Sequence, residues 1–405
     1  MDFLVNGSVY TARWKDEALS MHFNRLREAS SGSVSAEVLI QNHNDTNPHV
    51  HHARLNLVST RSRAEVAKHC TDRFPTIDWV ARIEQACVAA LRTYREGEPV
   101  VDITEMPVSE RLRYRVEPLL VEGHPNLIFG DGGLGKSLFA TYLSVLIAGG
   151  IVTNRLICEP GKVLYLDYEA SVDELKERYD AISAGLETDP PSMMYQFNYE
   201  PVAGRIEELQ AIVAEHNIGF VIIDSAAPAC GDEPEMTKNA IAFFRALRSL
   251  KVTTLTVAHV SKAGGGKAGP FGSKFWLNYP RSVWEVRKAQ EPGQNSIDFS
   301  LWHRKVNSSG LLAPLAYRVR FDTDEKQIVF DDIAVKDSEE LAKGLPLPHR
   351  IKAALEDGAM RSKDIAELLE VNANTLGATL SRDKKRFVLL PDGRWGNRER
   401  TFASD

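Results

Sequence analysis

One octapeptide constrains this chain more than any other feature of its sequence. Residues 130–137 read GDGGLGKS and match G-x-x-x-x-G-K-[ST], the pattern of a phosphate-binding P-loop. The apolar run at 125–129 predicts a buried strand before the loop, and the stretch at 138–147 predicts a helix after it. A chance glycine-rich turn would not need this context. The sequence therefore predicts a site for nucleotide phosphates between a strand and a helix.

The motif also assigns roles to its residues. Glycines let backbone N–H groups close around phosphate oxygens, and the dipole at the helix start favours negative charge. Lys136 is expected to reach the β- and γ-phosphates, and Ser137 to hold Mg²⁺. ATP and Mg²⁺ are therefore the predicted cofactors. The predicted ATP-binding residues are Gly130, Asp131, Gly132, Gly133, Leu134, Gly135, Lys136, Ser137 and Leu138.

Length and composition predict a soluble protein with several domains. The 405 residues are enough for two or three domains, and the hydrophobic and charged shares, 43% and 26%, are ordinary. Because the net charge is −6, any DNA contact must come from local basic surfaces. The four cysteines lack a C-x-x-C pairing, which favours a reducing, intracellular setting. Without a leader pattern or a run of about 18 apolar residues, we expect a cytoplasmic protein with no membrane span.

Hydrophobic periodicity divides the chain into four parts. Residues 1–97 predict a small N-terminal α/β accessory domain, and residues 98–120 predict a linker. Within the accessory domain, Asp78 suits the N-cap of a helix. The expected strands lie at 35–40 and 53–58, and the expected helices at 62–73 and 78–96.

The third part, residues 121–335, alternates strands and helices, as an α/β core with a mostly parallel sheet does. Strands are expected at 163–168, 220–224 and 253–258, with helices at 172–186, 204–216 and 237–250. Later strands at 282–287, 296–303 and 315–321 lack intervening helices. We therefore expect antiparallel pairing to add them to the sheet.

The fourth part, residues 346–405, predicts three helices and a β-hairpin, the order of a winged helix-turn-helix. The helices are expected at 349–356, 362–369 and 374–386, and the hairpin turn at 391–393. Basic residues near the third helix favour DNA, with Arg382 and Lys385 as predicted contacts. A protein-packing module is the alternative that this pattern allows.

Three residues that follow strands have the chemistry expected beside a P-loop. Glu169 can orient the water that attacks the γ-phosphate, although an acid here can instead cap the next helix. Asp224 ends a run of four apolar residues in the Walker B form, and would bind Mg²⁺ together with Ser137. His259 is expected to sense the γ-phosphate, with a core histidine as the alternative.

The segment at 261–270 is rich in glycine and lysine. In a ring of subunits, such loops can follow a nucleic-acid backbone through a central channel. Lys262 and Lys267 are therefore predicted nucleic-acid contacts. The same composition also fits an ordinary surface loop.

The order of P-loop, Glu169, Asp224 and His259 resembles that of the RecA-like ATPases, most closely the hexameric replicative helicases of plasmids and phages. The resemblance covers about half of the chain. The segment PFGSKFWLNYPRSVWE at 270–285 looks like that family's Gly-Ser…Arg element, whose arginine reaches the ATP of the neighbouring subunit. The resemblance implies that Arg281 is this arginine finger, which stabilises charge in phosphoryl transfer. A structural salt bridge is the alternative.

The resemblance implies a RecA-like P-loop NTPase core of α/β fold. The N-terminal α/β domain and the winged helix follow from the residue pattern alone, and they are additions that the single-domain plasmid helicases lack. It implies a ring-forming, ATP-driven DNA helicase or translocase in the replication of a mobile element, phage or plasmid. The expected partners are single-stranded DNA and further copies of the chain in a hexameric ring. A RecA/RadA-like recombination or repair ATPase and an ATP-gated DNA-binding regulator are the alternatives. The expected catalytic residues are Lys136, Glu169, Asp224, His259 and Arg281, and Lys305 and Asn307 are further candidates for contact between subunits.

Histidines gather in the N-terminal domain, where His43, His49, His51 and His52 lie close to Asp45. Their density suggests a metal site, but the intervening segment is turn-forming and no fixed ligand spacing is present. A polar hairpin loop is therefore expected. The role of this domain stays open between docking subunits and binding an origin, a primase or an initiator.

Overall fold

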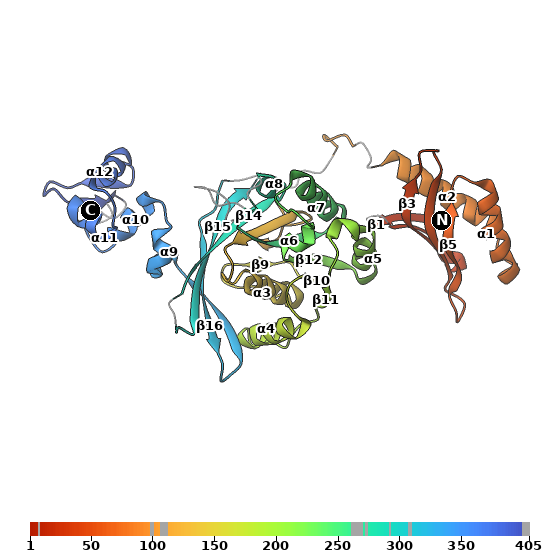
Figure 1. Cartoon of the computed structure of the whole chain (residues 1–405), viewed down its shortest axis with the longest axis horizontal. Helices are drawn as coiled ribbons and strands as arrows, with labels where there is room; N and C mark the ends of the chain where they lie inside the picture. The colour runs from red at the N-terminus through yellow and green to blue at the C-terminus, as the bar shows by residue number, and fades with distance from the viewer. Residues whose placement is uncertain are drawn as a thin grey trace.

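A computed structural model describes residues 1–6, 9–97, 101–105, 112–260, 270–271, 274–290, 293–306 and 310–398. Figure 1 shows an N-terminal unit of strands and helices, a large central sheet with its helices, and a small C-terminal unit of helices. Within the described residues, no helix is both long and apolar enough to cross a lipid bilayer.

The N-terminal unit is an antiparallel sheet in the order β1-β2-β3-β4-β5, with two helices. Residues of β4 alternate between buried and half-buried, so one face of the sheet packs against the helices and the other stays open. Asp78 caps α2 as predicted, by accepting the N–H of Ala81. The elements are β1 (Asp2–Asn6), β2 (Val9–Trp14), β3 (Leu19–Glu28), β4 (Val34–Asn42), β5 (His49–Asn56), α1 (Thr60–Arg73) and α2 (Trp79–Glu96).

Two features of this unit differ from the sequence prediction. The strands β1 to β3 were not predicted, although Leu19, Met21 and Phe23 of β3 alternate with polar residues, the pattern of a half-buried strand. All pairings in the sheet are antiparallel and the helices follow the strands, so the unit is α+β rather than α/β.

The central unit is built on a sheet of nine described strands in the order β11-β10-β12-β13-β8-β14-β15-β16-β17. The six strands from β11 to β14 pair in parallel. The strands are β8 (Pro125–Gly130), β10 (Lys162–Asp167), β11 (Met194–Phe197), β12 (Ile218–Asp224), β13 (Thr253–His259), β14 (Ser282–Ala289), β15 (Ser296–Val306), β16 (Leu315–Asp322) and β17 (Gln327–Ile333).

The pairing of β14 corrects the prediction for one of the later strands. The last strands were expected to join by antiparallel pairing, and β15, β16 and β17 do so. However, β14 lies parallel to β8, with Ser282 opposite Asn126. The long connection from β13 to β14 allows a parallel crossover although it contains only the short helix α8 (Lys274–Asn278) among its described residues.

Helices cover both faces of the parallel strands (Figure 1). One apolar cluster contains residues of α3 and α4, and the other contains residues of α5, α6 and α7. Strands buried on both faces read as continuous apolar runs, which is why the core strands were predictable from sequence. The helices are α3 (Lys136–Gly149), α4 (Val172–Gly185), α5 (Ile206–His216), α6 (Ala226–Cys230) and α7 (Thr237–Ser249), with the short helix η2 (Val202–Gly204) before α5.

The predicted linker at 98–120 is wrong for its last residues. Here β6 (Tyr114–Glu117) and β7 (Leu120–Val121) form a small sheet with β9 (Ile157–Cys158). Leu119 and Leu120 are buried in the central core, and the carbonyl of Leu119 accepts the indole N–H of Trp284. These few apolar residues give no periodic signal, and only the core they pack against makes them structured.

The C-terminal unit has helices α10 (Leu347–Ala354), α11 (Ser362–Leu368) and α12 (Ala373–Arg382), then β18 (Phe387–Leu389) paired with β19 (Trp395–Asn397). The short helices η3 (Val335–Asp337) and α9 (Glu339–Lys343) precede it. The third helix ends earlier than predicted, so Arg382 is its last residue and Lys385 lies in the turn before β18. The winged-helix assignment stays a prediction.

Candidate active site

The P-loop lies at the carboxyl end of β8, at the edge of the sheet where α/β folds bind ligands. Gly133 and Gly135 have φ values of +69° and +81°, which favour glycine. Gly130 is needed for a different reason, because a Cβ there would lie 2.6 Å from the carbonyl oxygen of Val286 in β14. The loop therefore turns sharply enough to place the first residues of α3 over the end of the sheet.

Lys136, the first residue of α3, is buried and points back into the loop. Its Nζ donates to the carbonyl oxygen of Asp131 at 2.6 Å and lies 3.4 Å from Nδ1 of His259. Burial lowers the pKa of this lysine, and the negative charge of Asp224 opposes that shift. A phosphate oxygen is a stronger partner for this ammonium than a carbonyl, so the side chain is already placed for nucleotide.

Asp224 ends β12 and is buried beside the start of α3. Its Oδ2 accepts the hydroxyl of Tyr165 at 2.6 Å. Burial raises the pKa of Asp224, hydrogen bonds from Tyr165 and Ser137 lower it, and the charges of Asp167 and Glu169 raise it. A hydroxyl and a carboxylate in contact, with further carboxylates close by, fit the oxygen ligands that Mg²⁺ takes. Ser137 and Asp224 would hold Mg²⁺, whose bound charge offsets that of the phosphates.

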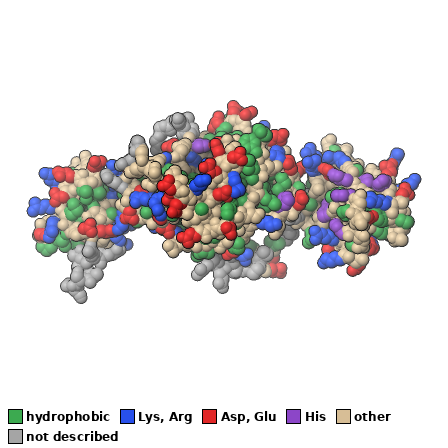
Figure 2. Space-filling model, turned by 90° about the horizontal axis from the view of Figure 1, so that it is seen from below, with side chains coloured by type: hydrophobic (Ala, Val, Ile, Leu, Met, Phe, Trp, Pro, Cys, Tyr) green, Lys and Arg blue, Asp and Glu red, His purple; other side chains and the backbone are tan. Residues whose placement is uncertain are grey.

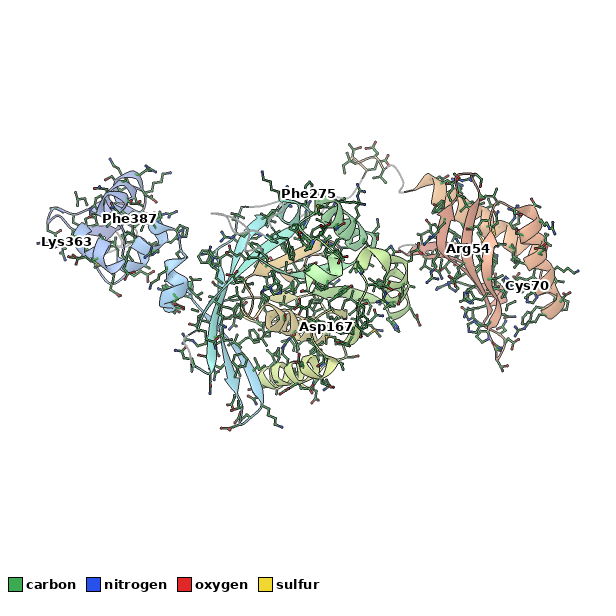
Figure 3. All side chains as sticks on the ribbon, viewed as in Figure 1. Arg54, Cys70, Asp167, Phe275, Lys363 and Phe387 are labelled. Carbon is green, nitrogen blue, oxygen red and sulfur yellow. The ribbon has the colours of Figure 1, made fainter. Side chains whose placement is uncertain are left out.

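Glu169 lies two residues beyond the end of β10. The carboxylate of Asp167, labelled in Figure 3, accepts the N–H groups of Glu169 and Ala170, each at 2.9 Å, and so fixes the turn. The Glu169 carboxylate accepts the hydroxyl of Ser225 and is exposed to the cleft. This exposed carboxylate is free to reach a water molecule. The positioning role of Asp167 was not predicted, although two acids at one strand end were a visible signal.

His259 ends β13 between the two charged groups of the site. Its Nδ1 faces Lys136, and its Nε2 lies 4.0 Å from the Glu169 carboxylate. Burial is the main cause of a lowered pKa for His259, and Lys136 adds to it, so the imidazole is neutral at neutral pH. The side chain of His259 is 39% exposed, whereas the alternative, a histidine of the core, would be buried.

A cleft of about 1300 Å³ adjoins these residues. The P-loop and α3 form one wall, α4 forms another, and the hairpin between β16 and β17 forms the third. Phe321 and Ile328 give this third wall an apolar surface, and Lys326 adds a positive charge to it. Arg178 adds a positive charge to the wall formed by α4. The cleft is large enough for a nucleotide. Sequence reasoning missed the hairpin wall because β17 was not predicted.

Arg281 does not join this site. It precedes β14, and its backbone N–H donates to the carbonyl of Pro125 at 2.7 Å, at the start of β8. The P-loop follows the other end of β8, about five strand residues or 17 Å away. Arg281 therefore cannot reach the phosphate site of its own chain.

Positive charge gathers around Arg281. Both Arg281 and Arg248 lower the pKa of Lys305, after the larger effect of burial. Lys305 donates to the carbonyls of Asn278 and Pro280, and Arg248 donates to that of Tyr279, so both hold the segment before Arg281. Among the described residues, the buried Nε of Arg281 has no hydrogen-bond partner. This cluster has the charge to receive an anion from outside the chain.

The remaining predicted residues are separate from the site. Lys262, Lys267 and Asn307 lie outside the described residues. Arg382 and Lys385 are exposed on the C-terminal unit. Among the described histidines of the N-terminal unit, His43 bonds to Ser20 and His52 to Glu37, and no group of three or more metal-ligand side chains converges.

Comparison with known proteins supports the interpretation of the central unit. Residues 93–265 match the family model of an AAA domain. The DNA repair protein RadA from two strains of Mycobacterium tuberculosis is 27% identical over 152 residues, which cover 37% of this chain and 30% of RadA. The chain thus spans under a third of the length of these curated relatives.

Among solved structures, a KaiC-like protein from the archaeon Pyrococcus horikoshii is 15% identical, with a TM-score of 0.38. The alignment covers 54% of this chain and 93% of that one. A score this low does not by itself establish a shared fold. Together, the motif set, the converging site and the AAA-domain and RadA matches support a RecA-like P-loop ATPase as the class of the central unit.

Proposed function

We propose that this protein is a RecA/RadA-like ATPase of DNA recombination or repair that works as an oligomer, with ATP between subunits. The observation that carries the proposal is the separation of Arg281 from the P-loop. The cation cluster around Arg281 lies at the amino end of the parallel strands, and the phosphate site lies at their carboxyl end. This arrangement suits a head-to-tail contact, in which the amino end of one copy meets the carboxyl end of the next. The similarity to RadA supports DNA as the partner.

In this proposal, each residue of the site has one task. The P-loop amides and Lys136 bind the phosphates, and Ser137 and Asp224 hold Mg²⁺. Glu169 orients the attacking water and takes its proton, while Asp167 keeps Glu169 in place. His259 links the γ-phosphate region to the segment that follows β13. Arg281 of a neighbouring copy stabilises the charge of the transition state.

The test is ATP hydrolysis with and without single-stranded DNA, on protein whose assembly is followed by light scattering. We expect stimulation of at least about tenfold together with an oligomer, because ordered subunits complete each site. Turnover that ignores DNA, from a protein that stays monomeric, would contradict the proposal.

Two further assays, strand unwinding and binding to duplex DNA, separate the other predictions. The replicative helicase stays a prediction, and unwinding of a forked duplex by the oligomer would favour it. The ATP-gated regulator predicts slow turnover, no strand separation and specific binding to one duplex sequence.

A further inference from the structure

The open face of the N-terminal sheet carries an ordered row of side chains. Leu4, Thr11, His22, Leu39 and His52 lie opposite one another on β1 to β5. The ring of His22 is fixed, because Nδ1 bonds to the Thr11 hydroxyl and Nε2 to the Ser20 hydroxyl, both at 3.0 Å. His52 is exposed, and Leu39 lies half-buried between the two imidazoles. The row therefore presents two flat rings and two leucines on one surface.

Arginines flank this row on both sides. Arg13 follows Thr11 by two residues on β2, so it points to the same face, and it pairs in register with Ser20. Arg54 follows His52 by two residues on β5 and lies opposite Glu37, on the other side of the row. Arg54 donates to the Ser35 hydroxyl at 3.0 Å. Among the described residues, no ion pair involves Arg13 or Arg54, so both charges are available.

The carboxylates near this face are already paired. Asp2 forms an ion pair with Lys15 at 2.9 Å, and Glu37 bonds to Arg25 at 3.2 Å and to His52 at 2.8 Å. Arg25 and Arg27 also approach Glu207 of α5, at 3.9 and 3.8 Å. The central unit thus contacts this face at Arg25 and Arg27, and it does not cover the row itself.

The charge of the face is visible on the surface. Figure 2 shows histidine side chains gathered with lysine and arginine side chains on the N-terminal unit, at the right. Figure 3 shows Arg54 on the strands and Cys70 on the helical side. Arg54 is exposed, whereas Cys70 is buried in the core beneath the helices. On the helical side, exposed arginines have acidic partners, such as Arg61 with Glu65 and Arg92 with Glu96.

We propose that single-stranded nucleic acid binds across this open face, with bases against His22, Leu39 and His52 and phosphates on Arg13 and Arg54. Imidazole rings are among the side chains on which unpaired bases stack. Arginines beside such a row supply sequence-independent contacts to the backbone. The major groove of a duplex admits an α-helix or a two-stranded ribbon, whereas this face presents five strands side by side and is therefore wider than that groove accepts. The face is separate from the ATPase site and from the contact between subunits.

The experiment measures binding of the full chain to a labelled 30-nucleotide strand by fluorescence anisotropy, without nucleotide and at several salt concentrations. The double variant Arg13→Ala/Arg54→Ala should raise Kd about tenfold and reduce the salt slope by about 1.4, since each single-strand phosphate contact contributes about 0.7. The matched control Arg61→Ala/Arg92→Ala removes two arginines from the helical side and should leave Kd within about twofold. Equal effects of the two double variants would overturn the proposal.

Variants of His52 separate stacking from charge. His52→Ala should raise Kd about fivefold, and His52→Phe should restore binding, because every base can stack on a flat ring. A strand carrying photoreactive 4-thiothymidine should crosslink to peptides of β2 to β5. Crosslinks confined to the other units would overturn the assignment, and so would a duplex that binds as tightly with the same dependence on Arg13 and Arg54.

The outcome is independent of the proposed ATPase function. Arg13→Ala/Arg54→Ala should leave ATP hydrolysis without DNA unchanged, because both residues lie outside the site. If the native protein hydrolyses ATP without response to DNA but still crosslinks through the sheet, this inference stands and the DNA-dependent motor falls.

Discussion

Three carboxylates lie close together in the site, and they differ in how far each is buried. Asp167 and Asp224 are buried, the first bonded to two backbone N–H groups and the second to a tyrosine hydroxyl. Glu169 alone is exposed to the cleft. A buried, hydrogen-bonded carboxylate holds its surroundings in place, whereas an exposed one can exchange partners with water. Glu169 is therefore the carboxylate suited to act on a water molecule.

Glu169→Gln should reduce ATP turnover about 10²-fold or more while nucleotide binding persists, because the amide cannot take a proton. Steady-state hydrolysis and binding of a fluorescent nucleotide measure the two effects. Glu174→Gln is the matched control, since Glu174 also lines the cleft but lies on α4 and should change turnover less than about twofold. If Glu169→Gln retained native turnover, the role of this residue in positioning water would be wrong.

At the scale of elements, the hairpin of β16 and β17 completes the cleft by packing on α4. The contact is close at Gly185, the last residue of α4, where an added Cβ would lie 2.2 Å from the carbonyl oxygen of Ile328. Backbone atoms cannot move aside as a flexible side chain can. The position of this wall therefore depends on the absence of a side chain at residue 185.

Gly185→Ala should destabilise the protein by about 1–3 kcal/mol, the usual cost of forcing extra atoms into a packed contact. Chemical denaturation measures this loss, and weaker nucleotide binding should accompany it because the cleft wall is displaced. Gly204→Ala is the control, since nothing lies within 4 Å of an added Cβ there. Equal stability of the two variants would show that α4 and the hairpin adjust without cost.

At the scale of the whole molecule, the proposed ATPase site needs Arg281 from a second copy of the chain. Arg281 lies at the amino end of the parallel strands and Lys136 lies beyond their carboxyl end, and no contact among the described residues brings them together. Head-to-tail association would place Arg281 of one copy against the P-loop of the next copy. This arrangement is expected to make hydrolysis depend on assembly.

Mixing two inactive variants tests the expected contact between copies. Lys136→Ala and Arg281→Ala should each lose nearly all turnover, whereas an equal mixture should recover up to about a quarter of native activity, because one interface in four combines the two intact halves. Hydrolysis after subunit exchange is the measurement. Lys136→Ala mixed with Glu169→Gln is the control and should recover nothing, since both residues belong to the same half. A mixture as inactive as its parts would rule out Arg281 as a residue that acts between subunits.

The sequence by itself determined the phosphate site and its neighbours at the strand ends. The P-loop is a local motif, and the acids and histidine after three buried strands had to meet at one edge because parallel strands share their carboxyl ends. Thus Lys136, Ser137, Glu169, Asp224 and His259 were predicted together and lie together.

Only the tertiary structure decided the parallel entry of β14, the hairpin wall of the cleft, the role of Asp167 and the open face of the N-terminal sheet. Periodicity reports whether a residue is buried, but not which strand pairs with which or which face stays uncovered. Pairing depends on contacts between residues far apart in the chain, as between β8 and β14. The same strand pairing sets the distance between Arg281 and the P-loop. The motif that contains Arg281 was visible in the sequence, but this distance was not.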